Sequence, residues 1–438
     1  MITAVVGRTF LNAYNDKYGK ALSPKEFFEK EYFELFYNHP KYMQWVTNSP
    51  FVQMKKGQKS HLLSEEERIE KLSNLDVKVK EETPDASFAI GFPASETKEF
   101  ASTSGLVSDV TIPADQEEVY LSWIGSGLGL GVAGGYTILF NDAEITLQTF
   151  EGWKHYRKYL NDPGLNKLRG NQINSWNGQW VAYSLGTDYR DNFTFGELTT
   201  AKVFKADEKL AEVNTVAWSQ LYFSLGNLNF EKVLTAYIYG YGQTNKTVGF
   251  FPFQLKSGKK LKEVYQKLFG EDFPINKKDF ESLFGIHIKR ACELGSIGLL
   301  ALRPQNLTKY MRNTKKFPLK KDEDFITYKA YKTWLTAMLS KNKEEITDYT
   351  QEVAQVILNY RNSGKGTGRK NLIENELFAS TSKKKFVEAL IAMIPDLEEE
   401  SLISIKKLRD EVHLMTNEEF GYFSTLLKFD YTFFEKQQ

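Results

Sequence analysis

A run of twenty residues without a charged side chain, residues 121–140, constrains this chain more than any other feature of its sequence. Six of the twenty are glycines, and "GLGVAG" at residues 129–134 has the G-x-G-x-x-G spacing of a dinucleotide-binding turn. That turn needs a strand before the glycines and a helix after them. Here "EVYLSWI" before and "YTILF" after both have strand composition. We therefore predict a buried hairpin whose glycines let backbone pack closely against a neighbour.

A membrane span is the other interpretation of this run, because about 20 uncharged residues can cross a bilayer. The glycine content, the lack of a second such run and the lack of a basic flank argue against a span, so no membrane partner is expected. Cys292 is the single cysteine, which excludes an internal disulfide and a thiolate metal cluster. With no signal-peptide pattern at the start, these features predict a cytoplasmic protein.

The order of sequence patterns along the chain predicts an α+β fold in two domains, as its 438 residues favour. Near the start, Ser23, Pro24 and Glu26 form a helix N-terminal signature. From residue 86 to about 253, runs such as "VYLSWI", "YTILF", "WVAYSL" and "AYIYGYG" indicate strands. After Pro318 every segment has helical spacing. We predict a strand-rich body with long loops at residues 1–320 and a helical bundle at 321–438, with the boundary between 318 and 322.

Catalytic motifs are absent from the sequence. The five histidines lie far apart and outside any metal-binding or nuclease pattern. "GKGTGRK" at residues 364–370 lacks the spacing of a phosphate-binding P-loop and a preceding strand. We expect a non-enzymatic protein without cofactor or metal. The basic residues of this segment form a candidate phosphate contact in an interhelical loop: Lys365, Arg369 and Lys370.

Two polar segments combine amides with aromatic rings. Amides offer a donor and an acceptor together, as reading a base edge requires, and aromatic rings offer stacking faces. The alternative for the first segment is an amide-rich turn held in the core by its tryptophans. The candidates in "GNQINSWNGQWVAY" are Asn171, Gln172, Asn174, Asn177 and Gln179, beside Trp176 and Trp180. Those in "GYGQTNKTVGFFPF" are Gln243, Asn245 and Lys246.

A third segment, "RPQNLTKYMRNTKKFPLKK" at residues 303–321, holds seven basic residues and no acidic one. Such a stretch can neutralise several phosphates, which favours a polyanionic partner over a merely solvated surface. The candidate nucleic-acid contacts in this stretch are Arg303, Gln305, Asn306, Lys309, Arg312, Lys315 and Lys316.

With its loops "GNQINSWNGQW", "GQTNKTVGFFPF" and "LRPQNLTKYM" followed by a helical bundle, the whole chain resembles the large subunit of type I CRISPR surveillance complexes (Cascade) in their small form. The resemblance implies a non-catalytic subunit for antiviral defence. It would bind the crRNA end, other Cascade subunits and target double-stranded DNA, recognise the protospacer-adjacent motif, and recruit the helicase-nuclease. No fixed contact motif of the family is matched, so no residue role is carried over.

Two alternatives of other classes stay open on the sequence. One is a metal-dependent nuclease or other defence-related hydrolase whose carboxylates and histidines meet only in space around Mg²⁺. The other is a protein–protein scaffold that uses its aromatic-rich bundle, in a chain with 32 Phe, 23 Tyr and 7 Trp.

Overall fold

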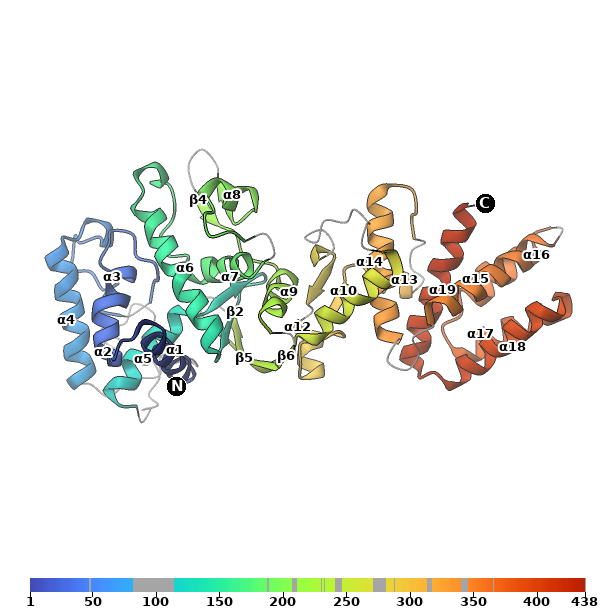
Figure 1. The fold of residues 1–438 in the computed structure, drawn as a ribbon, viewed down its shortest axis with the longest axis horizontal. Helices are drawn as coiled ribbons and strands as arrows, with labels where there is room; N and C mark the ends of the chain where they lie inside the picture. The colour runs from blue at the N-terminus through green and yellow to red at the C-terminus, as the bar shows by residue number, and fades with distance from the viewer. Residues whose placement is uncertain are drawn as a thin grey trace. The chain divides into compact units, whose positions relative to one another are not determined.

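The computed structural model divides the chain into two compact units (Figure 1). Unit 1 comprises Met1–Leu255 and Ala291–Ile297, and unit 2 comprises Lys256–Arg290 and Gly298–Gln438. The boundary predicted between residues 318 and 322 lies inside unit 2. The structure describes residues 1–46, 49–81, 114–186, 189–206, 211–229, 231, 233–240, 246–270, 281–286, 288–312, 317–339, 346–364 and 366–437.

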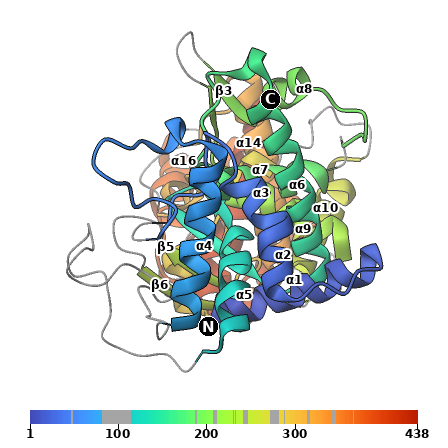
Figure 2. The same ribbon diagram turned by 90° about the vertical axis from the view of Figure 1, so that its left-hand side faces the viewer.

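Helices make up most of unit 1. Its longer helices are α1 (Ile2–Tyr18), α4 (Glu65–Glu81), α5 (Gln116–Gly127), α6 (Ala143–Asn161), α7 (Ile173–Ser184) and α9 (Trp218–Asn229). Its short helical segments are α2 (Pro24–Phe27), η1 (Phe28–Tyr32), α3 (Phe33–Phe36), η2 (Ser60–Leu62), η3 (Pro163–Leu165) and α8 (Phe195–Thr200). Helices α4, α5, α6 and the α2–α3 segment run side by side in Figure 2, and α1 packs against α5 and α6.

A four-stranded antiparallel sheet completes unit 1, in the order β1-β2-β5-β6. Its strands are β1 (Leu130–Val132), β2 (Tyr136–Phe140), β5 (Val233–Gly240) and β6 (Lys246–Gln254). The register pairs Ile138 with Leu130 on one side and with Ile238 on the other. A separate two-stranded sheet joins β3 (Phe204–Ala206) to β4 (Ala211–Val213). The fold is therefore α+β as predicted.

The strand-rich character predicted for residues 86–253 was wrong in two places. "VYLSWI" lies in α5, and "WVAYSL" lies in α7 together with much of the amide-rich segment. "YTILF" and "AYIYG" are strands, as predicted. The uncharged run thus forms the end of α5 and the β1–β2 hairpin, with Gly125 in the helix and Gly131 in β1. Its glycines therefore do not lie between a strand and a helix, as a dinucleotide-binding turn requires.

The glycines of this run permit close backbone contacts, as predicted. A Cβ atom on Gly125 would lie 1.9 Å from the Thr3 carbonyl oxygen in α1. One on Gly131 would lie 2.9 Å from the Asn174 carbonyl oxygen in α7. Because any larger side chain would collide with backbone at both positions, the run places α1, α5, β1 and α7 against one another.

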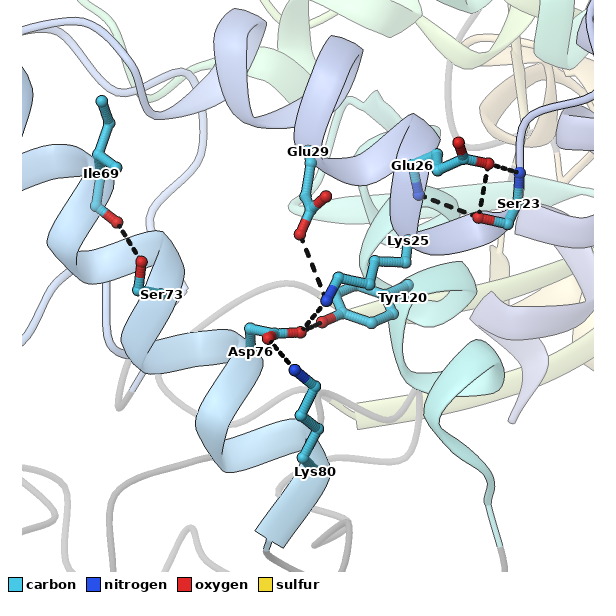
Figure 3. A network of polar contacts seen from close by, with 9 residues as sticks. All are labelled: Ser23, Lys25, Glu26, Glu29, Ile69, Ser73, Asp76, Lys80 and Tyr120. Carbon is cyan, nitrogen blue, oxygen red and sulfur yellow. Dashed lines mark hydrogen bonds and ion pairs between the residues drawn. The ribbon is translucent and has the colours of Figure 1, made fainter.

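A polar network attaches α4 to α2 and α5 (Figure 3). The Asp76 carboxylate accepts hydrogen bonds from the Lys25 ammonium at 2.5 Å, the Lys80 ammonium at 2.5 Å and the Tyr120 hydroxyl at 2.8 Å. Ser23 and Glu26 next to it form the predicted capping box of α2. Against the opposing effect of burial, the three donors lower the pKa of Asp76 to about 2.

In the described part of unit 2, the regular elements are helices and one pair of short strands, β7 (Phe284–Ile286) and β8 (Leu302–Pro304). Its longer helices are α10 (Lys256–Phe269), α14 (Asp322–Leu339), α15 (Ile346–Asn362), α17 (Lys383–Met393), α18 (Glu399–Leu414) and α19 (Asn417–Gln437). Its short segments are α13 (Leu307–Met311), α16 (Gly368–Asn371), η4 (Leu372–Leu377) and η5 (Ile394–Asp396). Helix α12 (Ile288–Leu294) begins in unit 2 and ends in unit 1.

Helix α19 contacts α13, α14 and α15, and α10 packs on α14. The core between α15, α17, α18 and α19 includes Ile357, Leu390, Leu408 and Phe423. The helical character predicted after Pro318 is confirmed, and a capping box at the start of α19 forms between Thr416 and Glu419.

Candidate nucleic-acid interface

The amide-rich segment predicted as a loop is mostly helix α7, and two of its five amide side chains are buried in the core. Asn177 is fully buried and donates to the carbonyl oxygens of Gly127 at 2.7 Å and Gly129 at 3.0 Å. Its own carbonyl accepts from the Trp153 indole at 3.2 Å. Gln179 is buried as well. In this conformation neither side chain presents an edge to a base, and the alternative of an amide segment held in the core describes both.

The two tryptophans of α7 are buried in the same way. The indoles of Trp176 and Trp180 donate to the carbonyl oxygens of Gly152 and Gln148, at 2.7 and 2.8 Å. Their stacking partners come from the protein itself, since the Trp176 ring lies 5.2 Å from the Tyr156 ring in a stacked arrangement. These rings therefore do not form an open platform for bases.

The remaining amides of the segment lie nearer the surface. Asn171 is exposed, and Asn174 is half-buried. The Gln172 side-chain carbonyl accepts from the Val213 backbone amide at 3.0 Å, which joins α7 to β4. In the second segment, Gln243 and Asn245 lie outside the described residues, and Lys246 is exposed at the start of β6.

The basic stretch at residues 303–321 runs from β8 through α13 to the start of α14. Arg303 is half-buried, with its guanidinium 5.6 Å from the Trp334 ring and Nη2 2.6 Å from the Met311 sulfur. Burial lowers the pKa of this guanidinium. Arg303 is therefore a packing residue, a role that its place in a charged stretch did not predict.

The other candidates in this stretch lie outside the core. Gln305, Asn306, Lys309 and Arg312 are exposed, and Asn306 adopts a left-handed backbone conformation with φ of 63° just before α13. Lys315 and Lys316 lie outside the described residues. The backbone amides of Lys320 and Lys321 donate to the Asp324 carboxylate at 2.9 and 3.0 Å, which fixes both residues at the start of α14.

In the segment between α15 and α17, Lys365 lies outside the described residues. The Arg369 guanidinium donates to the Tyr360 carbonyl at 3.3 Å and the Ser363 hydroxyl at 2.6 Å, and it pairs with Asp396 at 3.2 Å. These contacts make Arg369 a structural residue of this segment. Lys370 is about half exposed, with its ammonium 3.9 Å from Glu374.

A longer basic segment, which the motifs did not predict, is evident from the regional charge. Residues 256–321, named here the basic segment, hold sixteen Lys or Arg and six Asp or Glu, a net charge of +10. The whole chain has 57 basic and 56 acidic residues, so the rest carries −9. The segment includes α10, β7, α12, β8 and α13, and nearly all of it belongs to unit 2 (Figure 1).

Helix α10 begins this segment and is strongly amphipathic. Its buried residues are Gly258 and Leu261, on the side that packs towards α14. Two of its lysines have carboxylate neighbours: Lys259 lies 3.7 Å from Glu263, and Lys262 lies 3.3 Å from Glu281. Other basic side chains of the segment are exposed, including Lys267, Lys289, Arg312, Lys320 and Lys321.

Among the residues that the structure describes, no group of three or more His, Cys, Asp or Glu side chains is arranged to hold a metal ion. Within the same residues, no helix combines the length and apolar character that a membrane crossing requires. Comparisons with protein-family models, with curated proteins and with solved structures found no match to this chain. The resemblance to Cascade large subunits stays a prediction.

Proposed function

We propose that this chain binds nucleic acid through the basic segment of unit 2. The observation that carries the proposal is the concentration of net charge of +10 within residues 256–321 of a chain with a net charge of +1. Lysine and arginine residues that approach phosphates release condensed counterions, which drives binding independently of sequence. The acidic remainder of the chain disfavours contact elsewhere, so the charge distribution also orients the protein on a strand.

The sequence resemblance extends this proposal to a biological role. In that role the chain is a non-catalytic large subunit of a type I CRISPR surveillance complex. It contacts the crRNA end and target DNA, recognises the protospacer-adjacent motif and recruits the helicase-nuclease. Among the described amide candidates, Asn171, Gln305 and Asn306 are exposed and Asn174 is half-buried, and these four are proposed to contact base edges.

The test is fluorescence anisotropy with labelled duplex DNA, single-stranded DNA and RNA over a series of salt concentrations, with and without Mg²⁺. The test variant is Lys320→Glu/Lys321→Glu. Its matched control is Lys384→Glu/Lys385→Glu, which reverses two exposed charges in the first turn of α17, in the same unit. For duplex DNA, loss of two phosphate contacts should reduce the slope of log K against log salt by about 2 in the test variant alone.

Three results would contradict parts of the proposal. Equal binding by the test and control variants would show that Lys320 and Lys321 do not contact the strand. Cleavage that EDTA abolishes would indicate the metal-dependent nuclease. An absence of binding at low salt would favour the protein scaffold.

The role in a surveillance complex needs its own experiment. The tagged chain is purified from its natural host, and the RNA that accompanies it is sequenced. We expect RNAs of uniform length that share one 5′ sequence, as crRNAs cut from a repeat do. A heterogeneous RNA population would contradict the Cascade role while leaving general nucleic-acid binding intact.

A further inference from the structure

A cavity of about 810 Å³ lies in unit 2 between the end of α10, one side of α14, α15 and the last turns of α19. Its volume is within the range of pockets that hold small organic ligands. Its lining combines aromatic rings with a few polar groups, which occupy different parts of the cavity. None of the candidate contacts described above lines this cavity.

Aromatic rings form the walls. Phe269 from α10 and Phe433 from α19 are half-buried, and Phe325 from α14 is 37% exposed. Behind Phe433, the Tyr328 ring lies parallel to it, with 5.4 Å between ring centroids and 6° between planes. The walls therefore offer flat π-surfaces that a planar ligand can reach from solvent.

A buried ion pair closes the floor. The Lys332 ammonium lies 2.5 Å from the Asp430 carboxylate, and the two side chains are 4% and 1% exposed. Asp430 also accepts from the Thr350 hydroxyl at 2.8 Å and the Tyr328 hydroxyl at 3.2 Å. Burial raises the pKa of the Asp430 carboxyl, and these donors oppose that rise. The three donors hold the Asp430 carboxylate in place at the floor of the cavity, and the Lys332 ammonium balances its charge.

Besides this floor, the cavity is lined by Lys329, Gln351 and the Asp322 carboxylate at the start of α14. Lys329 is 8% exposed, and its ammonium lies 5.2 Å from the Phe269 ring centroid. Burial lowers the pKa of this ammonium to about 8, so it is still mostly charged at neutral pH. Gln351 from α15 is half-buried and supplies an amide donor and acceptor.

The cavity lining includes the end of α10 and the start of α14, named here the mouth of the cavity, and exposed lysines of the basic segment directly precede these lining residues in the sequence. Lys267 directly precedes the lining residues at the end of α10, and Lys320 and Lys321 directly precede Asp322, which lines the cavity at the start of α14. All three lysines are exposed. A strand that follows the basic segment would thus pass the opening.

We propose that this cavity receives one nucleotide, with its base between the aromatic walls, its edge towards Gln351 and Lys329, and its phosphate towards the lysines at the mouth. The proposal rests on the proposed function, because the basic segment brings the strand to the cavity. An aliphatic ligand would use the rings but neither the amide nor the cation, and an inorganic anion would use the cation but not the rings. A base with its phosphate uses all of them.

The experiment uses the full chain and a short single-stranded DNA with one 2-aminopurine, whose fluorescence reports stacking. A duplex of the same length is titrated beside it. The test variant is Phe325→Ala, at a partly exposed position where truncation leaves the core intact. Its control is Phe250→Ala, at a phenylalanine of unit 1 that is 62% exposed. A third arm measures the thermal shift that free nucleoside monophosphates cause, which distinguishes a strand from a free nucleotide as the source.

We expect 2-aminopurine fluorescence to be quenched on binding to the wild-type chain and to the Phe250→Ala variant. The Phe325→Ala variant should lose the quenching and bind the single strand roughly fivefold or more weakly, with duplex affinity unchanged. An unchanged single-strand affinity and unchanged quenching in Phe325→Ala would overturn the cavity proposal and leave the basic segment's role standing. Binding of mononucleotides without binding of any strand would keep the cavity and overturn the proposed function. Binding of neither would overturn both.

Discussion

The two units bury polar side chains with different kinds of partner. In unit 1, Asn177 hydrogen-bonds backbone carbonyls of the glycine run, and the buried Arg157 donates to the carbonyls of Leu35 at 2.7 Å and Lys41 at 3.2 Å. In unit 2, the buried Lys332 and Asp430 satisfy each other between α14 and α19. The buried polar side chains of unit 1 therefore fix the path of its backbone, whereas those of unit 2 fix the pairing of α14 with α19.

This difference decides what each unit can present to a partner. Unit 1 uses Asn177 and the tryptophans of α7 internally, where they donate hydrogen bonds to buried backbone carbonyls. Unit 2 places one ion pair at the centre and leaves the lysines of the basic segment at the surface. Both units contain a segment whose composition suggested binding. The amide-rich segment of unit 1 lies largely in the core, whereas the lysines of the basic segment of unit 2 lie at the surface.

The largest expected effect comes from breaking the ion pair of unit 2. Asp430→Ala leaves the Lys332 ammonium buried without its carboxylate, so we expect α14 and α19 to lose about 3–5 kcal/mol of stability. Hydrogen exchange measures the free energy of opening of each helix separately, which is needed because a chain of two units does not unfold in a single step. Asp410→Ala, at an exposed aspartate, is the control. Equal loss of protection in unit 1 would show that the units unfold together and would break the comparison.

The double variant Lys332→Met/Asp430→Leu sharpens this result. Replacing a buried ion pair by apolar residues of similar volume is often neutral, so its stability should return close to that of the wild type. A double variant as unstable as Asp430→Ala would mean that the contacts of Asp430 with Thr350 and Tyr328 carry the stability instead.

The second effect tests the backbone-directed hydrogen bonds of unit 1. Asn177→Leu leaves two carbonyl oxygens and the Trp153 indole unpaired in the core, which should cost about 3 kcal/mol. We expect faster hydrogen exchange in α5, β1 and α7, with α19 unaffected. Asn171→Ala, at an exposed position of the same segment, should leave exchange unchanged. Comparable exchange in the two variants would contradict the structural role of Asn177.

The smallest effect concerns the polar attachment of α4 and depends on pH. The pKa of Asp76 is about 2 in the folded chain, below the ordinary value of 3.8. Its stabilisation is therefore complete above about pH 4 and is lost as the pH falls towards 2. Allowing for solvent screening, we expect about 1 kcal/mol. Hydrogen exchange of α4 at decreasing pH, corrected for intrinsic rates, should show this loss in the wild type and not in Asp76→Asn.

Amphipathic helices with caps were predictable from the sequence. The capping signal at Ser23 and the helical spacing after Pro318 correspond to helices in the structure. Helices α5 and α7 were not predictable in this way, because residues 119–127 and 176–182 are buried on every side. A helix without a polar face has no 3.6-residue period, and its aromatic and β-branched residues then resemble a strand.

The exposed lysines of the candidate interface could be predicted from charge. The burial of its amides could not be predicted, because it depends on hydrogen-bond partners that are distant in the sequence. Lys320 and Lys321 remain at the surface because buried ammonium groups need partners. Asn177 could not be distinguished from a surface amide, since its acceptors lie 48 and 50 residues away along the chain. The cavity in unit 2 likewise joins four helices whose proximity no local pattern contains.

The close contact of α1 with α5 has a consequence for synthesis on the ribosome. Thr3 and Ser122, whose hydroxyls meet at 2.6 Å across this contact, lie 119 residues apart. At translation rates of about 5–20 residues per second, α1 emerges roughly 6–24 s before its partner. During that interval Phe10, which is buried in the finished protein, also lacks Phe150 and Trp153 of α6, whose rings pack against it. The nascent chain therefore offers chaperones a binding site that closes only when α5 and α6 have emerged.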